Sequence, residues 1–194
     1  MRYERTVEPT SLPVTVSEVK QHGYISTSDD DTYLDGLIAK ATRYVEQVAS
    51  RQLMSATWVL RLDGFPEEIE LRVLPVTAIS SLAYTDADGV SQTLTATTDY
   101  QVDLESPDHP ARIRPAYGCT WPSTRGETYN TVRVTFTAGY ASAAAVPVTY
   151  KHAIQLLVQH WYENREPVNI GNIVNAIPLS FSVLLAAEGW GPYA

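Results

Sequence analysis

The hydrophobic residues of this 194-residue chain change their spacing twice, from a helical period to a strand period and back. From about Asp30 to Ser50, apolar residues recur every three or four positions, which is typical of one face of an α-helix. From Leu53 to about Tyr140, apolar and polar residues alternate, which is typical of strands with one buried face. Helical spacing returns after Pro147. The pattern predicts an α+β fold in which helices flank an antiparallel β region.

Local signals place the ends of the helices. Thr15 and Glu18 have the spacing of a capping box, and Gly23 is a plausible end for a short first helix. Pro167 prevents the helix that begins at Pro147 from continuing far. A last apolar stretch predicts a short helix over about residues 179–187. Within the β region, the dipeptide Asp88-Gly89 predicts a hairpin turn.

These elements predict two parts. Residues 1–52 and 141–194 form a helical core, a small bundle built from the N- and C-terminal helices. Residues 53–140 form an antiparallel β insertion. Because the insertion interrupts the helical part, the outer helices must meet in space. We therefore expect Ile38 and Val45 to pack near Leu157 and Trp161.

Composition excludes several classes of protein. The formal net charge is −8, whereas a protein that grips DNA through its phosphates needs the opposite sign. The single cysteine, Cys119, rules out an intrachain disulfide and a multi-cysteine zinc site. The charged N-terminus lacks the apolar stretch of a signal peptide, and no apolar run is long enough to span a membrane.

The stretch "HWYENREP", residues 160–167, looks most like an active site. His160 and Glu163 lie three positions apart and share one flank of a helix, which leaves open a small hydrolase that uses both. A metal site would need a further ligand, and the H-E-x-x-H pattern is absent. Structural ion pairs far outnumber catalytic ones, so we favour a helix end over a site.

Three other stretches carry a weaker signal. "SDDDT" lacks the alternating acids of a calcium loop and is better interpreted as the start of a helix. Cys119 lies in a Pro/Gly loop near His109, with nothing obvious to activate the thiol. A β-rich carbohydrate-binding module is a second alternative. It would use the aromatic side chains of the long loop, which are Tyr117, Trp121 and Tyr129.

Taken in order, the segments of the chain resemble the head–tail connector, or adaptor, proteins of tailed bacteriophages and of phage-derived gene transfer agents. The matching segments span nearly the whole chain: "VSEVKQH", "DDDTYLDGLIAKATRYVEQVASRQL", "TWVLRLDGFP", "PAYGCTWP", "VTFTAGY", "VPVTYKHAIQLLVQHWYENRE" and "IP" near the end. The most diagnostic feature is "HWYENRE" after a helix that begins with "VP". Cys119 stands where a polar residue is expected in this family.

The resemblance implies a structural protein without enzymatic activity, catalytic residues, cofactors or metals. It implies a virion or phage-like particle, assembled in the host cytoplasm, with the protein at the head–tail junction. The subunits would form a ring, commonly a dodecamer, beneath the portal protein and above the next tail-side component. DNA would pass through the ring without specific binding, and no membrane would be involved.

A segment as apolar as the C-terminal stretch "LSFSVLLAAEGWGPYA" rarely remains solvated on a monomer. The sequence alone narrowly favours a stretch that folds back on the chain's own core, and a contact with another subunit is the alternative. Gly189, Gly191 and Pro192 oppose a continuing helix. We expect Leu184 and Leu185 to pack against helices, while Trp190 and Tyr193 reach a partner subunit. The resemblance places that partner in the portal or in a ring neighbour.

Overall fold

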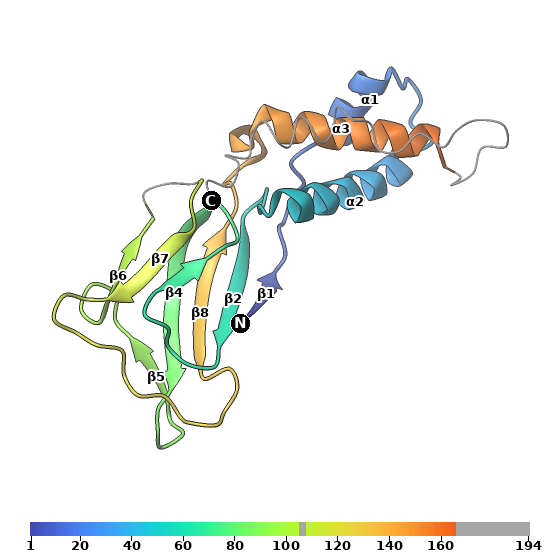
Figure 1. Ribbon diagram of the computed structural model, residues 1–194. Helices are drawn as coiled ribbons and strands as arrows, with labels where there is room; N and C mark the ends of the chain where they lie inside the picture. Colours follow the sequence, from blue (N-terminus) through green and yellow to red (C-terminus); the bar gives the residue numbers. More distant parts are fainter. Residues whose placement is uncertain (105–107, 166–194) are drawn as a thin grey trace. The chain divides into compact units, whose positions relative to one another are not determined.

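The computed structural model of the protein describes residues 1–104 and 108–165. The chain divides into two compact units (Figure 1). The first, named the β unit, contains Met1–Pro9 and Ser55–Gly139. The second, named the helical unit, contains Thr10–Met54 and the described residues from Tyr140 on. Each unit is built around its own hydrophobic core.

The β unit consists of two antiparallel sheets (Figure 1). The larger has the strand order β1 (Arg2–Val7), β2 (Ala56–Leu62), β8 (Val132–Ala138), β4 (Val76–Thr85), β5 (Ser91–Leu94). The smaller has the order β3 (Ile69–Leu71), β7 (Ala111–Pro115), β6 (Tyr100–Asp103). The predicted antiparallel β region is therefore confirmed.

Alternation along the strands builds the core of the β unit. On β8, Val132, Val134 and Phe136 are fully buried, and their neighbours in sequence are less so. Ile69 and Ile113 face the same core from the smaller sheet, where they are register partners. Each such side chain stabilises the fold by about 1.5–3 kcal/mol relative to leaving it in water.

The hairpin between β4 and β5 turns at the predicted position. Gly89 has a φ of 86°, in the left-handed region that glycine adopts without strain. A Cβ at this position would also lie 2.5 Å from Arg125 Nη1. The Asp86 carboxylate accepts hydrogen bonds from the backbone N–H groups of Asp88 and Val90, which closes the turn.

Strand β1 was not predicted, because the sequence grouped residues 1–9 with the helices. The strand pairs with β2 and belongs to the β unit. Its residues are exposed or half-buried and show no clear period of two. Tyr3 ties the strand to the unit, since its ring packs edge-on against Phe136 and its hydroxyl donates to the Glu70 carbonyl over 3.0 Å.

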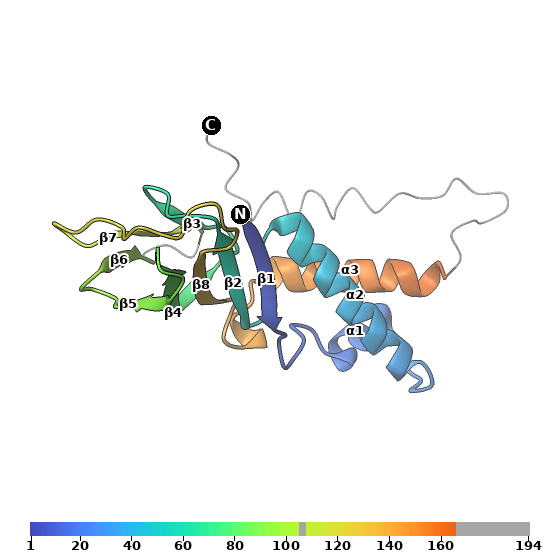
Figure 2. The ribbon, with the colours of Figure 1, turned by 90° about the horizontal axis from the view of Figure 1, so that it is seen from below.

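The helical unit contains α1 (Val16–Gly23), α2 (Asp31–Ala49) and α3 (Val148–Glu163), with a 3₁₀ turn at Ala143–Ala145. The capping box is confirmed: Glu18 N–H donates to Thr15 Oγ1 over 3.2 Å, and Thr15 N–H donates to Glu18 Oε2 over 2.7 Å. Gly23 is the last residue of α1, and the left-handed cap position falls on Tyr24. Figure 2 shows the same helices in a second view.

Helices far apart in sequence share one core in this unit. Ile38 and Val45 of α2 and Leu157 of α3 are fully buried in it, and Trp161 packs against it. Trp161 also meets Tyr44 edge-on, with ring centroids 6.3 Å apart. The expected packing of α2 on α3 is confirmed, as is the α+β class. The helix predicted over residues 179–187 lies outside the described residues.

Within the described part of the chain, no helix combines the length and the apolarity that a membrane span requires.

Candidate functional site

The stretch "HWYENR" forms the last turn of α3 and the residues that end it. Asn164 donates to the carbonyl oxygen of His160 through its backbone N–H over 3.0 Å and through Nδ2 over 2.9 Å. The carboxylate of Glu163 accepts a hydrogen bond from Gln159 Nε2 over 2.6 Å. His160 thus contributes a backbone acceptor, and Glu163 is bonded to Gln159. This geometry is that of a helix end.

Asp30 holds that helix end to the start of α2. The residue occupies the N-cap position of α2, yet its side chain makes no capping hydrogen bond. Instead, Asp30 Oδ2 accepts hydrogen bonds from Tyr162 Oη over 2.7 Å and from Arg165 Nη2 over 2.9 Å. The bond from Tyr162 is the main cause that lowers the pKa of Asp30, and the bond from Arg165 comes second.

Arg165 completes this cluster by stacking on two rings. Its Cζ lies 4.7 Å from the ring centroid of Tyr33 and 5.0 Å from that of Tyr162. A guanidinium over an aromatic face is attracted by the ring's quadrupole. The hydrogen bond to Asp30 raises the pKa of Arg165 and that of Tyr162. We call Asp30, Tyr33, Tyr162 and Arg165 the Asp30 clamp.

Two further ion pairs tie α1 to the other helices. Lys20 Nζ lies 2.8 Å from Asp31 Oδ1 on α2, and Lys151 Nζ of α3 lies 2.9 Å from Glu18 Oε1. The hydrogen bond from Lys151, followed by that from the Thr15 backbone, lowers the pKa of Glu18 to about 2. Glu18 therefore caps α1 and pairs with α3 at once.

The acids of "SDDDT" start a helix, as expected, and also form contacts with other helices. They stand at the start of α2 as predicted, but Asp30 and Asp31 use their carboxylates on α3 and α1. Asp31 still favours the helix dipole from the first turn. Among the residues that the structure describes, no group of histidine, cysteine or acidic side chains could hold a metal ion.

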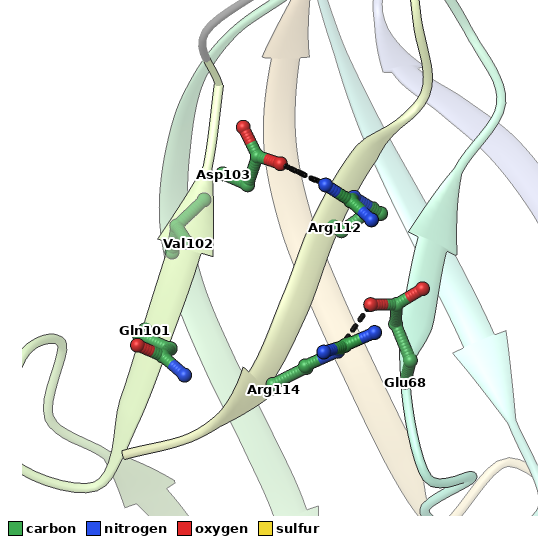
Figure 3. A pocket seen from close by; sticks show the side chains of 6 residues that line it. All are labelled: Glu68, Gln101, Val102, Asp103, Arg112 and Arg114. Atoms are coloured by element: carbon green, nitrogen blue, oxygen red, sulfur yellow. Dashed lines mark hydrogen bonds and ion pairs between the residues drawn. The ribbon is translucent and has the colours of Figure 1, made fainter. Parts of the chain in front are cut away.

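A hollow of about 180 Å³ lies on the outer face of the smaller sheet (Figure 3). Its lining is Glu68, Gln101, Val102, Asp103, Arg112 and Arg114. Arg112 Nη2 lies 2.5 Å from Asp103 Oδ2, and Arg114 pairs with Glu68. The pairing with Asp103 raises the pKa of Arg112. Two cations and two anions cancel, so the hollow offers an anion no net attraction, and both carboxylates of its lining are engaged by arginines.

The three aromatic residues of the long loop do not form one platform. Trp121 stacks on Phe65, with centroids 4.6 Å apart and planes 8° apart, and it covers the core of the β unit. Tyr117 and Tyr129 are exposed, with relative solvent accessibilities of 101% and 83%. Cys119 is exposed too, and its Sγ lies 3.7 Å from the Thr98 carbonyl oxygen.

The proposed contact residues Leu184, Leu185, Trp190 and Tyr193 lie outside the described residues. The clamp, by contrast, was not predicted. Its two halves each have a helical spacing of three, Asp30 with Tyr33 and Tyr162 with Arg165. The spacing is that of neighbours on a helix face, although Asp30 is the N-cap of α2 and Arg165 lies beyond the end of α3. It does not show that the two pairs meet.

Residues 13–106 match the sequence profile of the family described as phage gp6-like head-tail connector proteins. No curated protein is similar enough in sequence to count as a relative.

Several solved structures share the fold, among them three chains from gene transfer agent (GTA) particles. A chain from the neck of an empty GTA particle, computed with C6 symmetry, is 24% identical, with a TM-score of 0.77 over 96% of this chain and 94% of that one. A chain from the virion of a native GTA particle is 24% identical, with a TM-score of 0.76 over 97% of this chain and 95% of that one. A chain from the neck of a native GTA particle, computed with C12 symmetry, is 25% identical, with a TM-score of 0.73 over 96% of this chain and 94% of that one.

Proposed function

We propose that this chain, which over residues 13–106 belongs to the phage gp6-like head-tail connector family, is a structural subunit of the neck of a phage or gene transfer agent particle. The observation that carries the proposal is the agreement of two independent comparisons. The sequence profile matches a connector family, and the fold matches neck chains over nearly their whole length.

In this function the subunits form a ring, and we propose twelve copies. A neck chain of the same fold comes from a particle computed with C12 symmetry, and another from one computed with C6 symmetry, which twelve copies also satisfy. The ring lies beneath the portal protein, extends the DNA channel and carries the next tail-side component.

The two parts of the chain divide this work. We propose that the N- and C-terminal helices form the helical bundle, from residue 10 to 54 and from residue 140 on, and that the β region is an insertion in the sequence of this bundle, joined by strand β1 from residues 1–9. In the bundle, Leu184 and Leu185 pack against helices, and Trp190 and Tyr193 reach the portal or a ring neighbour. The Asp30 clamp supports the helical bundle, because it ties the start of α2 to the end of α3.

Charge supports a channel that does not grip DNA. The net charge of −8 opposes binding to phosphates. On the face shown in Figure 3, Arg112 and Arg114 are each paired with an acid of the same unit. A paired arginine attracts a phosphate less than a free one does.

No observation favours the two alternatives. The hydrolase would need His160 and Glu163 to act together, but Glu163 is bonded to Gln159 at the end of a helix. The carbohydrate-binding module would need Trp121 on the surface, but that ring stacks on Phe65. We therefore propose a structural protein without catalytic residues or cofactors.

Counting the chain in purified particles tests the proposal. Quantitative mass spectrometry of particles from producing cells should find about twelve copies for each portal ring. Absence of the chain from particles that are otherwise complete would contradict the function, and a copy number near the number of capsid subunits would contradict the neck location.

A further inference from the structure

Strand β4 is longer than the strand that covers one of its sides. On one side, β4 pairs with β8 from Val76 to Tyr84. On the other side, β5 pairs with it from Leu82 to Thr85 alone, beside the final part of β4 (Figure 1). Within the part of the chain that the structure describes, no strand pairs with that side of residues 76–81. We call this side of residues 76–81 the open edge.

The open edge lacks the usual protection of an edge strand. Unpaired backbone N–H and C=O groups at a sheet edge can pair with any extended chain, and proteins usually guard them with charged side chains or proline. The sequence of the open edge, "VTAISS", contains neither. Its exposed side chains, Thr77, Ala78 and Ser80, are small and uncharged. The open edge is therefore suited to pairing with one more strand.

Strand β1 is a matching edge on the opposite side of the same sheet. It is the first strand in the order β1-β2-β8-β4-β5, and β2 is its only strand partner among the described residues. It has six residues, as many as the open edge. Val7 at its end and Met1 beside its start are exposed apolar side chains, which a further strand would help to cover.

The strand directions also fit. The pairs β1–β2, β2–β8 and β8–β4 are all antiparallel, so β4 runs opposite to β1. In a sheet that continues into a neighbouring copy, the neighbour's β1 therefore lies antiparallel to β4, which is the commoner pairing.

Charge does not oppose this contact, although each copy has a net charge of −8. The charged residues of β1 are Arg2, Glu4 and Arg5, so its cations outnumber its acid. The open edge has no charge. Pairing the two edges therefore places no like charges opposite each other across the strands.

Pairing between two different edges of one sheet joins copies head to tail, and such contacts close into a ring when the rotation between copies closes. A sheet that continues round a ring has to curve. Register shifts interrupt the pairing of β4 with β8 and that of β1 with β2. Such irregularities bend a strand and increase its twist. Both of the edges that would meet thus carry a feature that favours curvature.

We propose that β1 of one copy pairs antiparallel with the open edge of β4 in the next copy, so that the larger sheets of neighbouring subunits form one continuous sheet. This inference rests on the proposed function, because it requires a ring, and it adds the contact through which each subunit joins the next.

Photo-crosslinking from β1 identifies its neighbour. The variant with p-benzoylphenylalanine in place of Val7 is produced together with the wild-type chain, and purified particles are irradiated with ultraviolet light. We expect a product with twice the mass of the chain, in which mass spectrometry places the link between position 7 and residues 76–81. A link to a different protein, a link to another part of a second copy, or no link in particles that contain the variant would each refute the inference.

Lysines on the open edge test the contact independently. Ala78 and Ser80 are exposed in the single subunit, so the double variant Ala78→Lys, Ser80→Lys should shift the thermal unfolding midpoint by less than about 3 °C. Its copy number in purified particles should fall roughly tenfold or more, because lysine at a strand edge opposes pairing. A normal copy number would overturn the inference. A large fall in the midpoint would count against it too, since these residues would then support the subunit's own fold.

Thr93→Lys is the matched control, because Thr93 is exposed on β5, the edge strand beside β4. This variant should enter particles in normal number. An equal loss would mean that a lysine anywhere on this side of the sheet blocks entry, and the assignment to residues 76–81 would be wrong. The wild-type chain, measured alongside, separates the two proposals: its own absence from particles would contradict the proposed function instead.

Discussion

The carboxylate oxygen Oδ2 of Asp30 accepts a hydrogen bond from the hydroxyl of Tyr162 over 2.7 Å, across 132 positions of sequence. The same oxygen lies 2.9 Å from Arg165 Nη2. This contact joins the start of α2 to the end of α3, and most of the β unit lies between them in sequence. The stretch that looks most like an active site, residues 160–167, therefore contributes two side chains to a structural contact between helices.

Replacing Asp30 with asparagine should loosen the end of α3 while leaving the fold intact. Asparagine retains an oxygen that can accept from Tyr162 but loses the charge that attracts Arg165. We expect faster amide hydrogen exchange in the last turn of α3 and at the start of α2, with unchanged exchange in the β unit. Tyr162→Phe should give the same pattern. Unchanged exchange in both variants would show that the clamp does not order this end.

Glu18 should make the helical unit sensitive to acid. Its folded pKa of about 2 lies below the ordinary value of 4.5, so its contribution is present above pH 4.5 and is lost as the pH falls toward 2. Because the Glu18 side chain is 38% exposed, we expect it to contribute only on the order of 1 kcal/mol to the free energy of unfolding. Urea unfolding at pH 7 and pH 3 measures it: Glu18→Gln should destabilise the protein at pH 7 and less so at pH 3. The exposed Glu127→Gln serves as control, and equal losses for Glu18→Gln at both pH values would contradict this.

The two hydrophobic cores should respond as buried, well-packed sites. Phe136→Ala in the β unit should cost about 3–5 kcal/mol, and Leu157→Ala in the helical unit about 2–5 kcal/mol. Both side chains are fully buried. Chemical denaturation followed by circular dichroism measures each loss. A cost below about 1 kcal/mol for either variant would mean that its site is not packed as described.

His160 and Glu163 should be dispensable. The double variant His160→Gln, Glu163→Gln keeps the backbone carbonyl that Asn164 uses, so the helix end should survive. We expect normal folding and a copy number in particles within about twofold of wild type, since changes at surface residues seldom cost more than about 0.5 kcal/mol. A hydrolytic activity of the wild-type protein that disappears in this variant, with folding unchanged, would revive the hydrolase alternative.

Removing residues 189–194 tests the C-terminal contact. The truncated chain retains every described helix and strand, so we expect it to fold with an unchanged circular dichroism spectrum. Without Trp190 and Tyr193 it should not join the particle. Normal occupancy of the truncated chain would show that the apolar tail is not the anchor that we propose.

The sequence predicted those elements whose pattern is set by burial on one face. The helix stripe of Leu34, Ile38 and Val45 and the alternation of Val132, Val134 and Phe136 both follow from a single buried face. The Thr15–Glu18 box and the Asp88-Gly89 turn were found because their chemistry is local.

The features that the sequence did not predict depend on contacts between residues distant in sequence or on exceptions to local rules. Strand β1 lies at a sheet edge with charged, half-exposed residues, so it has no hydrophobic period to detect. The bond between Asp30 and Tyr162 needs the fold to bring the two residues together. Gly23 ends α1 as expected, but the sequence did not show that its small size allows the close approach of Gln159 or that Tyr24 takes the left-handed position.

Electron cryo-microscopy of the particle neck tests whether this chain is the connector. We predict a ring beneath the portal with twelvefold density, into each repeat of which the β unit and the helical unit can be fitted. A neck reconstruction of comparable detail in which every ring is filled by other proteins would contradict the function proposed for this chain.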